Sequence, residues 1–250
     1  MFKTIWKQVA LAGALAFAGS AQATVIFGDG GAALQAVLDD ITQVTVANPT
    51  GDSSVDVVTD QESPDELWVI GGSGGSVSTI VIELAGFAND NVFGIYDAAN
   101  PANFVQIFGG PAGPGDQALI SILADGSVIL NFADTGIDFA ANLFGYYLTS
   151  PEGTWYSETA LNSDGVDHMA AYQGVGDQIL IPPFAAGPWG PSEYILAWED
   201  LDCNTGCDAD YTDFVVLVES VNPVPEPGTL ALLGVALAGF GFARRGGRKA

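Results

Sequence analysis

The chain has 250 residues, with 30 Asp and Glu residues against only six Lys and Arg residues. All six basic residues lie before residue 8 or after residue 243, so the span 24–225 holds 29 acids and no Lys or Arg. This span cannot neutralise phosphates, which argues against nucleic acid as a partner. Bound divalent cations would relieve its self-repulsion, although an acidic surface that only keeps a secreted protein soluble is the alternative.

The first 23 residues have the layout of a secretory signal peptide. A start with two Lys is followed by an apolar stretch over 9–18 and by Ala21-Gln22-Ala23, a cleavage site of the A-x-A type. We therefore expect cleavage between Ala23 and Thr24, with Thr24 as the first residue of the mature chain. The alternative is that the segment is kept as a membrane anchor.

The elements predicted after residue 24 are mostly short strands. One apolar face at helical spacing predicts a short helix over 31–42. Strands are predicted at 55–58, 68–70, 76–84, 91–96, 103–108, 118–123, 127–132, 143–148, 154–156, 167–172, 178–181, 194–198 and 214–218. This pattern predicts one all-β domain over 24–221 with a single core, an antiparallel β-sandwich of jelly-roll-like type.

The densest acidic cluster follows the strand predicted at 194–198, with five Asp and one Glu within 199–213. Each pair of carboxylates about 4 Å apart costs roughly 1 kcal/mol even in water. A hard cation with oxygen ligands would offset that cost, and Ca2+ fits best. The ligand candidates are Glu199, Asp200, Asp208, Asp210 and Asp213. Backbone carbonyls, Asn204 or water would complete the six to eight oxygens that Ca2+ takes. A solvated acidic turn without metal is the alternative.

Both cysteines of the chain, Cys203 and Cys207, lie inside this acidic loop. In an oxidising compartment a C-x3-C pair predicts a small disulfide loop. Zinc binding or redox chemistry is the alternative. The pair has no His close by in the loop, zinc requires four ligands, and the spacing is not the C-x-x-C of redox motifs.

The C-terminal residues 222–250 form a separate segment. The sequence Val224-Pro225-Glu226-Pro227 is followed by an apolar stretch over 228–243 and by a basic tail. As a helix this stretch would be about 24 Å long, which is short for a membrane span, with the basic tail in the cytoplasm. In order and spacing the segment closely resembles the PEP-CTERM sorting signal. That resemblance implies transient membrane insertion and cleavage near Pro225 to Pro227 by an exosortase, a membrane cysteine protease-transpeptidase. It also implies secretion to the surface or extracellular matrix of a Gram-negative bacterium that makes exopolysaccharide.

Three further stretches resemble a domain of unknown function, number 4114 (DUF4114), over about 77–221. They are Phe93-Gly-Ile-Tyr-Asp97, residues 144–169 and residues 198–216. Cys207 after Gly206, and Thr212 before the last Asp, depart from the family's pattern. The resemblance implies a β-sandwich with a Ca2+ loop and no established enzyme activity.

The sequence favours a non-enzymatic surface protein, stabilised by Ca2+, with a structural or adhesive role in an exopolysaccharide biofilm. No catalytic residue is predicted: His168, the only His, is expected to be hydrogen-bonded or to support the acidic loop. The alternatives are a Ca2+-dependent lectin and a glycan hydrolase. A lectin would stack sugar rings on exposed aromatic side chains, for which core packing is the competing interpretation; the candidates are Trp155, Tyr156, Trp189, Tyr194 and Trp198.

Overall fold

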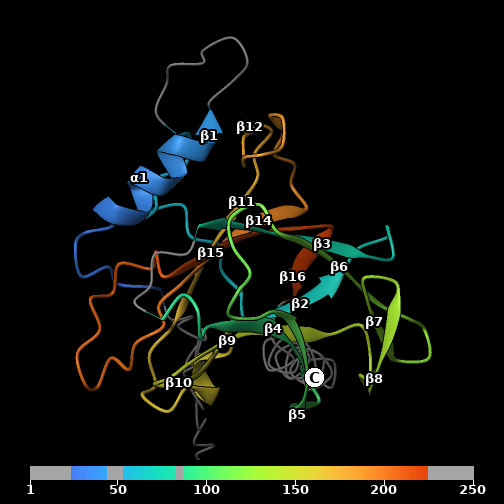
Figure 1. Ribbon diagram of the computed structural model, residues 1–250. Helices are drawn as coiled ribbons and strands as arrows, with labels where there is room; N and C mark the ends of the chain where they lie inside the picture. Colours follow the sequence, from blue (N-terminus) through green and yellow to red (C-terminus); the bar gives the residue numbers. More distant parts are fainter. Residues whose placement is uncertain (1–23, 44–52, 83–86, 225–250) are drawn as a thin grey trace, which may run out of the picture.

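The computed structural model describes residues 24–43, 53–82 and 87–224 (Figure 1). The predicted signal peptide up to Ala23 lies outside these residues, as do Pro225, Glu226, Pro227 and the helix predicted over 228–243. Within the described ranges, no helix combines the length and the apolar character that crossing a membrane requires.

The predicted short helix is confirmed as α1, Ala32–Ile41. Its apolar stripe buries Leu34, Leu38 and Ile41, as expected for a surface helix packed on a sheet. Asp29 caps the start of the helix, because its carboxylate accepts hydrogen bonds from the backbone N–H groups of Gly31 and Ala33, each at 2.7 Å.

The rest of the described chain is mostly antiparallel sheet, which confirms the all-β prediction. The six-stranded sheet contains, in spatial order, β16 (Val221–Val224), β2 (Leu67–Ile70), β9 (Phe144–Ser150), β4 (Val92–Asp97) and β5 (Asn100–Phe108), with β10 (Gly153–Tyr156) paired to β9. The seven-stranded sheet contains β11 (Met169–Gln173), β14 (Glu193–Trp198), β15 (Phe214–Glu219), β3 (Ser76–Ile82), β6 (Gln117–Ile122), β7 (Ser127–Leu130) and β8 (Ala133–Asp138). A small sheet joins β1 (Thr42–Gln43), β12 (Gln178–Ile179) and β13 (Gly187–Pro188), and a 3-10 turn spans Thr159–Leu161.

The two large sheets lie face to face as a sandwich, with α1 outside the seven-stranded sheet (Figure 1). The main core lies between them and includes Trp68, Phe93, Tyr146 and Trp198. Because side chains alternate between the two faces of a strand, every second residue of β11, β14 and β15 leaves this core and lies on the outer face of the sheet.

A second buried cluster lies on that outer face, where the sequence predicts a single core. Ile195, Val215 and Leu217 pack there with Leu34 and Leu38 of α1. Strands β14 and β15 are therefore covered on both sides. Double coverage explains why residues 214–218 are apolar without alternation, since both sets of side chains are buried.

Several segments differ from the predicted strands, among them the two-residue strands β1 and β13, which were not predicted. Residues 55–58 do not form a strand, because Asp56 closes a turn by accepting hydrogen bonds from the backbone of Val58 and Thr59. Strand β8 was not predicted because it is mostly exposed and Ile137 is its one large apolar side chain packed against the core. Strand β16 contains Pro223, which an edge position tolerates because one side of an edge strand needs no donor.

Candidate metal site

Four of the five predicted ligands converge at one end of the pair β14–β15. Carboxylate oxygens of Glu199, Asp208, Asp210 and Asp213 all lie within 4.8 Å of one another. The register explains half of the set: Trp198 pairs with Phe214, so Glu199 leaves β14 next to the point where Asp213 enters β15. The loop between the strands folds back to add the other two carboxylates.

The folding of that loop depends on two residues with left-handed backbone, Ala209 at φ 52° and Tyr211 at φ 56°. Each such residue costs roughly 1–2 kcal/mol when it is not glycine. Contacts with the N-terminal segment offset this cost. The backbone N–H of Gly28 donates to the carbonyl of Ala209 at 2.9 Å, and the Tyr211 ring packs edge-on against Phe27 with centroids 5.3 Å apart.

Gly28 also makes the close approach possible. A Cβ at this position would lie 2.2 Å from the carbonyl oxygen of Asp208. Nothing in the local sequence around residue 28 indicates this contact, since its partner is far away along the chain. The N-terminal segment is therefore part of the site, and the sequence analysis missed it.

Glu199 has the least favourable electrostatic environment of the four carboxylates. Its side chain is 0% exposed; Oε1 accepts a hydrogen bond from the backbone of Leu201 at 3.2 Å, and the buried Oε2 has no hydrogen-bond partner among the described residues. Burial, followed by the charge of Asp213, raises the pKa of Glu199 to about 9. Burial, followed by the charge of Asp200, raises the pKa of Asp213 to about 7. Without a cation, this group resists carrying its full negative charge.

Asp200, the fifth predicted ligand, lies beside the group rather than in it. Its Oδ2 accepts a hydrogen bond from the amide of Asn91 at 2.9 Å, and its backbone N–H donates to Oδ2 of Asp213 at 3.0 Å. Its carbonyl oxygen accepts from the Ser150 hydroxyl at 2.6 Å and from the Trp155 indole at 2.9 Å. Asp200 therefore positions Asp213 and holds the strand end in place.

His168 lies next to the carboxylate group and holds the backbone of Glu199 in place, which agrees with the prediction that it supports the acidic loop. Its ring is 0% exposed, stacks on Trp155 with centroids 4.1 Å apart, and donates from Nδ1 to the carbonyl of Glu199 at 3.0 Å. Nε2 lies 2.9 Å from Oδ2 of Asp164. Burial raises the pKa of Asp164, but hydrogen bonds from the backbone of Val166, from His168 and from the backbone of Cys203 outweigh it and lower that pKa overall. Both ring nitrogens of His168 therefore have oxygen partners, which fix the orientation of the ring.

Cys203 and Cys207 form the predicted disulfide, with an S–S distance of 2.05 Å. Asp164, His168 and Cys203 also come close enough to hold a metal. The sulfur of Cys203 is oxidised, however, and both nitrogens of His168 already have partners. This second group is therefore neither a thiolate metal site nor a Cys–His nucleophile.

The disulfide is expected to stabilise the loop moderately. Replacing both Cys203 and Cys207 with Ser should lower the free energy of unfolding by about 2 kcal/mol, because a short closed loop removes little entropy from the unfolded chain. Urea denaturation of wild type and variant, each with and without reductant, measures this. Reductant should shift the midpoint of the wild type alone, and a wild-type midpoint unaffected by reductant would contradict the prediction.

Most of the aromatic residues considered for sugar stacking belong to the core. Trp155, Trp189 and Trp198 are 0% exposed and Tyr194 is 1% exposed. Core packing, the competing interpretation, is therefore confirmed for these four residues. Tyr156 alone is partly exposed, on the outer face of the six-stranded sheet.

Comparison with known families settles the function of the C-terminal segment. The family described as the PEP-CTERM protein-sorting motif matches residues 223–248. The chain ends in a PEP-CTERM sorting motif. This motif is the recognition signal for exosortase processing and implies a secreted, cell-surface protein of a Gram-negative bacterium. The match reaches only the last two residues of β16 and leaves the rest of the sandwich uncovered, so the resemblance of residues 77–221 to DUF4114 stays a prediction.

The other comparisons add little. No curated protein matches the chain. Among solved structures, a Chromobacterium violaceum lectin in complex with alpha-methyl-fucoside aligns with 12% sequence identity and a TM-score of 0.28, covering 65% of this chain and 100% of the lectin. A TM-score this low does not indicate a shared fold.

Proposed function

We propose that this chain is a calcium-stabilised protein of the bacterial cell surface, with a structural or adhesive role in an exopolysaccharide matrix and without catalytic activity. The calcium site is proposed from the environment of Glu199: its buried Oε2 has no hydrogen-bond partner in the described part of the chain, while three Asp carboxylates lie within 4.8 Å. A buried, unpaired carboxylate oxygen among like charges is costly. A bound cation would remove that cost.

The donor set fits Ca2+ better than other common metals. All four side chains offer carboxylate oxygens, the ligand type that Ca2+ prefers. Zinc favours nitrogen and sulfur ligands. Neither type is offered here, since the nearby His168 and Cys203 are already engaged.

The charge of the whole chain supports the same conclusion. Residues 24–225 contain 29 acids without Lys or Arg, so no ammonium or guanidinium group of this span can neutralise the four carboxylates. The ring nitrogens of His168 face Asp164 and the carbonyl of Glu199 rather than the carboxylate group. A divalent cation would compensate half of the charge of four ionised carboxylates and lower the raised pKa values of Glu199 and Asp213.

The destination given by the sorting motif also suits this role. A protein sent to the cell surface meets an oxidising environment, in which the Cys203–Cys207 disulfide persists. Extracellular modules bind Ca2+ with dissociation constants of about 0.1–1 mM. An ion that holds the corner between β14 and β15 would keep the domain folded once it is outside the cell.

Calorimetric titration of the full chain with Ca2+ tests the proposal. We expect a binding heat for the wild type and an affinity reduced at least about tenfold in Asp213→Asn, which removes one charged ligand. Asp202→Asn is the matched control, because Asp202 lies in the same loop but outside the carboxylate group. A wild type without binding heat, or an equal loss of affinity in both variants, would contradict the proposed site.

A further inference from the structure

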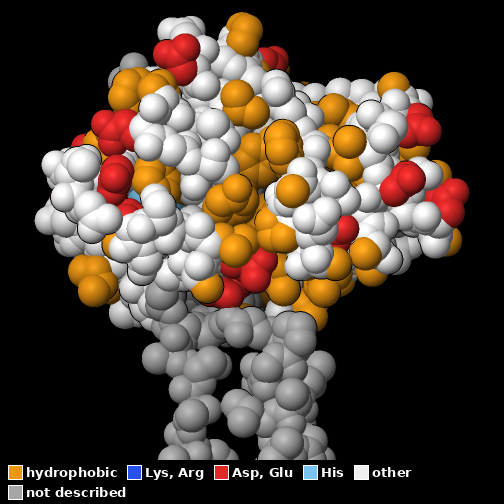
Figure 2. All heavy atoms as spheres, turned by 90° about the horizontal axis from the view of Figure 1, so that it is seen from below, with side chains coloured by type: hydrophobic (Ala, Val, Ile, Leu, Met, Phe, Trp, Pro, Cys, Tyr) orange, Lys and Arg blue, Asp and Glu red, His pale blue; other side chains and the backbone are white. Residues whose placement is uncertain are grey.

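The outer face of the six-stranded sheet carries aromatic side chains that no core explains. Along β9, Phe144, Tyr146 and Leu148 point into the main core, so Tyr147 and Thr149 lie on the opposite face. The outer face of an antiparallel sandwich is usually polar. Here, by contrast, Figure 2 shows hydrophobic side chains gathered in the middle of the face that is seen from below in Figure 1.

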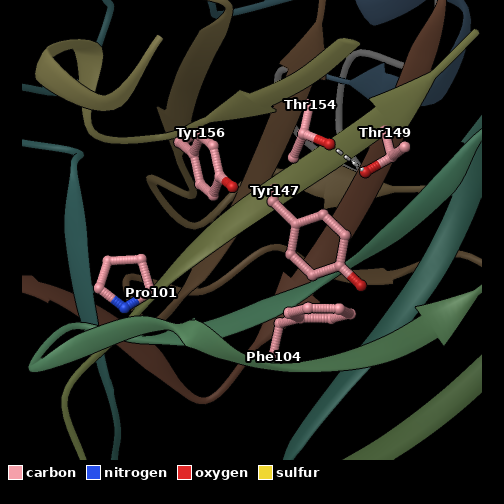
Figure 3. A pocket seen from close by; sticks show the side chains of 6 residues that line it. All are labelled: Pro101, Phe104, Tyr147, Thr149, Thr154 and Tyr156. Atoms are coloured by element: carbon pink, nitrogen blue, oxygen red, sulfur yellow. Dashed lines mark hydrogen bonds between the residues drawn. The ribbon is translucent and has the colours of Figure 1, made fainter.

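A shallow pocket opens on this face (Figure 3), lined by Pro101, Phe104, Tyr147, Thr149, Thr154 and Tyr156. Phe104 packs edge-on against Tyr147, with centroids 5.7 Å apart, and is still 56% exposed. Gly94 makes room for this arrangement, because a Cβ there would lie 2.8 Å from the Tyr147 ring. The aromatic walls are thus held in place from beneath while the Phe104 ring stays open to solvent.

The polar groups around the pocket are hydroxyls. Thr149 and Thr154 share a hydrogen bond of 2.9 Å along one side, and the Tyr156 hydroxyl points toward Tyr147 in Figure 3. The Tyr147 side chain is 4% exposed, and its hydroxyl has no hydrogen-bond partner among the described residues. An unsatisfied buried hydroxyl is costly, and a ligand group can pair with it once the side chains that cover it shift. Among the residues that the structure describes, those lining the pocket are all uncharged.

We propose that this pocket binds one ring of a neutral sugar within a glycan. Sugar rings combine an apolar C–H face, which packs on Phe104, Tyr156 or Pro101, with hydroxyls that pair with the Thr and Tyr hydroxyls of the lining. The 29 acids of residues 24–225 repel uronate and sulfated sugars, which favours a neutral ligand. The site goes beyond the proposed calcium function and does not depend on it.

The test is a binding assay of the full chain, kept in a detergent without a sugar headgroup, against immobilised neutral and acidic oligosaccharides. We expect binding to neutral hexose oligosaccharides but not to acidic ones. Phe104→Ala and Tyr156→Ala should each weaken binding about tenfold, the size of a lost aromatic contact. Phe132→Ala is the matched control, because Phe132 is 88% exposed but lies outside the pocket, and it should bind like the wild type.

Two further variants keep the result decisive. Tyr147→Phe removes the unpaired hydroxyl and keeps the ring, so it should weaken sugar binding without lowering the melting temperature. Asp213→Asn should leave sugar binding unchanged in the folded protein, which separates this proposal from the calcium site. The proposal is overturned if the wild type binds no neutral glycan, if both Phe104→Ala and Tyr156→Ala bind normally, or if an apolar peptide occupies the pocket and the sugar does not.

Discussion

Calcium added to the metal-free protein at pH 8 is expected to raise the melting temperature by about 5–10 °C. The reason is linkage: an ion present at about 100 times its dissociation constant stabilises the folded state by about 2.7 kcal/mol. For a domain of 150–250 residues, each kcal/mol shifts the melting temperature by about 2–4 °C. Scanning calorimetry of the full chain in calcium and in chelator measures the difference.

The calcium effect should depend on pH in a defined direction. In the metal-free folded protein, the pKa values of about 9 for Glu199 and about 7 for Asp213 exceed their ordinary values of 4.5 and 3.8. Between about pH 4 and pH 9 the folded state therefore holds protons that the unfolded state has released, so the stability of the metal-free protein falls as the pH rises. Calcium must displace these protons, so its effect should be small at pH 5 and large at pH 8. Equal shifts at both pH values would contradict this assignment.

Glu199→Gln gives the sharpest control for this experiment. The substitution keeps the shape of the side chain and removes the charge that burial disfavours. We expect the variant to melt at or above the temperature of the metal-free wild type, and calcium to have little effect on it. A variant that is less stable in chelator, yet still stabilised by calcium, would mean that Glu199 is structural and not a ligand.

Replacing Trp155 with Ala is expected to lower the free energy of unfolding by about 3–5 kcal/mol and also to weaken calcium binding. The loss of stability follows from the cavity left by a fully buried indole. The loss of affinity follows from two contacts: the indole N–H holds the carbonyl of Asp200, and the ring stacks on His168, which in turn holds the carbonyl of Glu199. Without these contacts the end of β14 is free to shift relative to Asp213.

Trp189→Ala is the matched control for this variant. Trp189 is also 0% exposed but belongs to the second cluster, and its indole nitrogen has no hydrogen-bond partner among the described residues. In urea denaturation, Trp189→Ala should lower the free energy of unfolding by a similar amount. Its calcium affinity should equal that of the wild type, as measured by titration calorimetry at a temperature where both variants are folded. If both variants keep wild-type affinity, Trp155 does not position the site.

Several features could be predicted from the sequence because they depend on neighbouring residues. Helical spacing over 31–42 predicts α1, and the apolar stretches 194–198 and 214–218 predict β14 and β15. The sorting motif is a contiguous pattern at the C-terminus, and the acidic loop is visible as composition alone. In each case the physical signal lies within a few residues of the feature itself.

Other features depend on which segments meet in the fold, and only the tertiary structure decided them. The sequence proposes Asp200 as a ligand on equal terms with its neighbours, but the amide of Asn91 binds its carboxylate at the side of the group. Gly28 is remote from the acidic loop in the sequence but contacts its backbone at Ala209. Helix α1 covers the outer face of the seven-stranded sheet and so creates the second buried cluster. Strand register likewise decides that Trp155 faces the core while Tyr156 faces the outer pocket. The sequence by itself thus determined that the chain carries many carboxylates and aromatic rings. Long-range packing determined which of them converge, because convergence depends on contacts between residues far apart in the sequence.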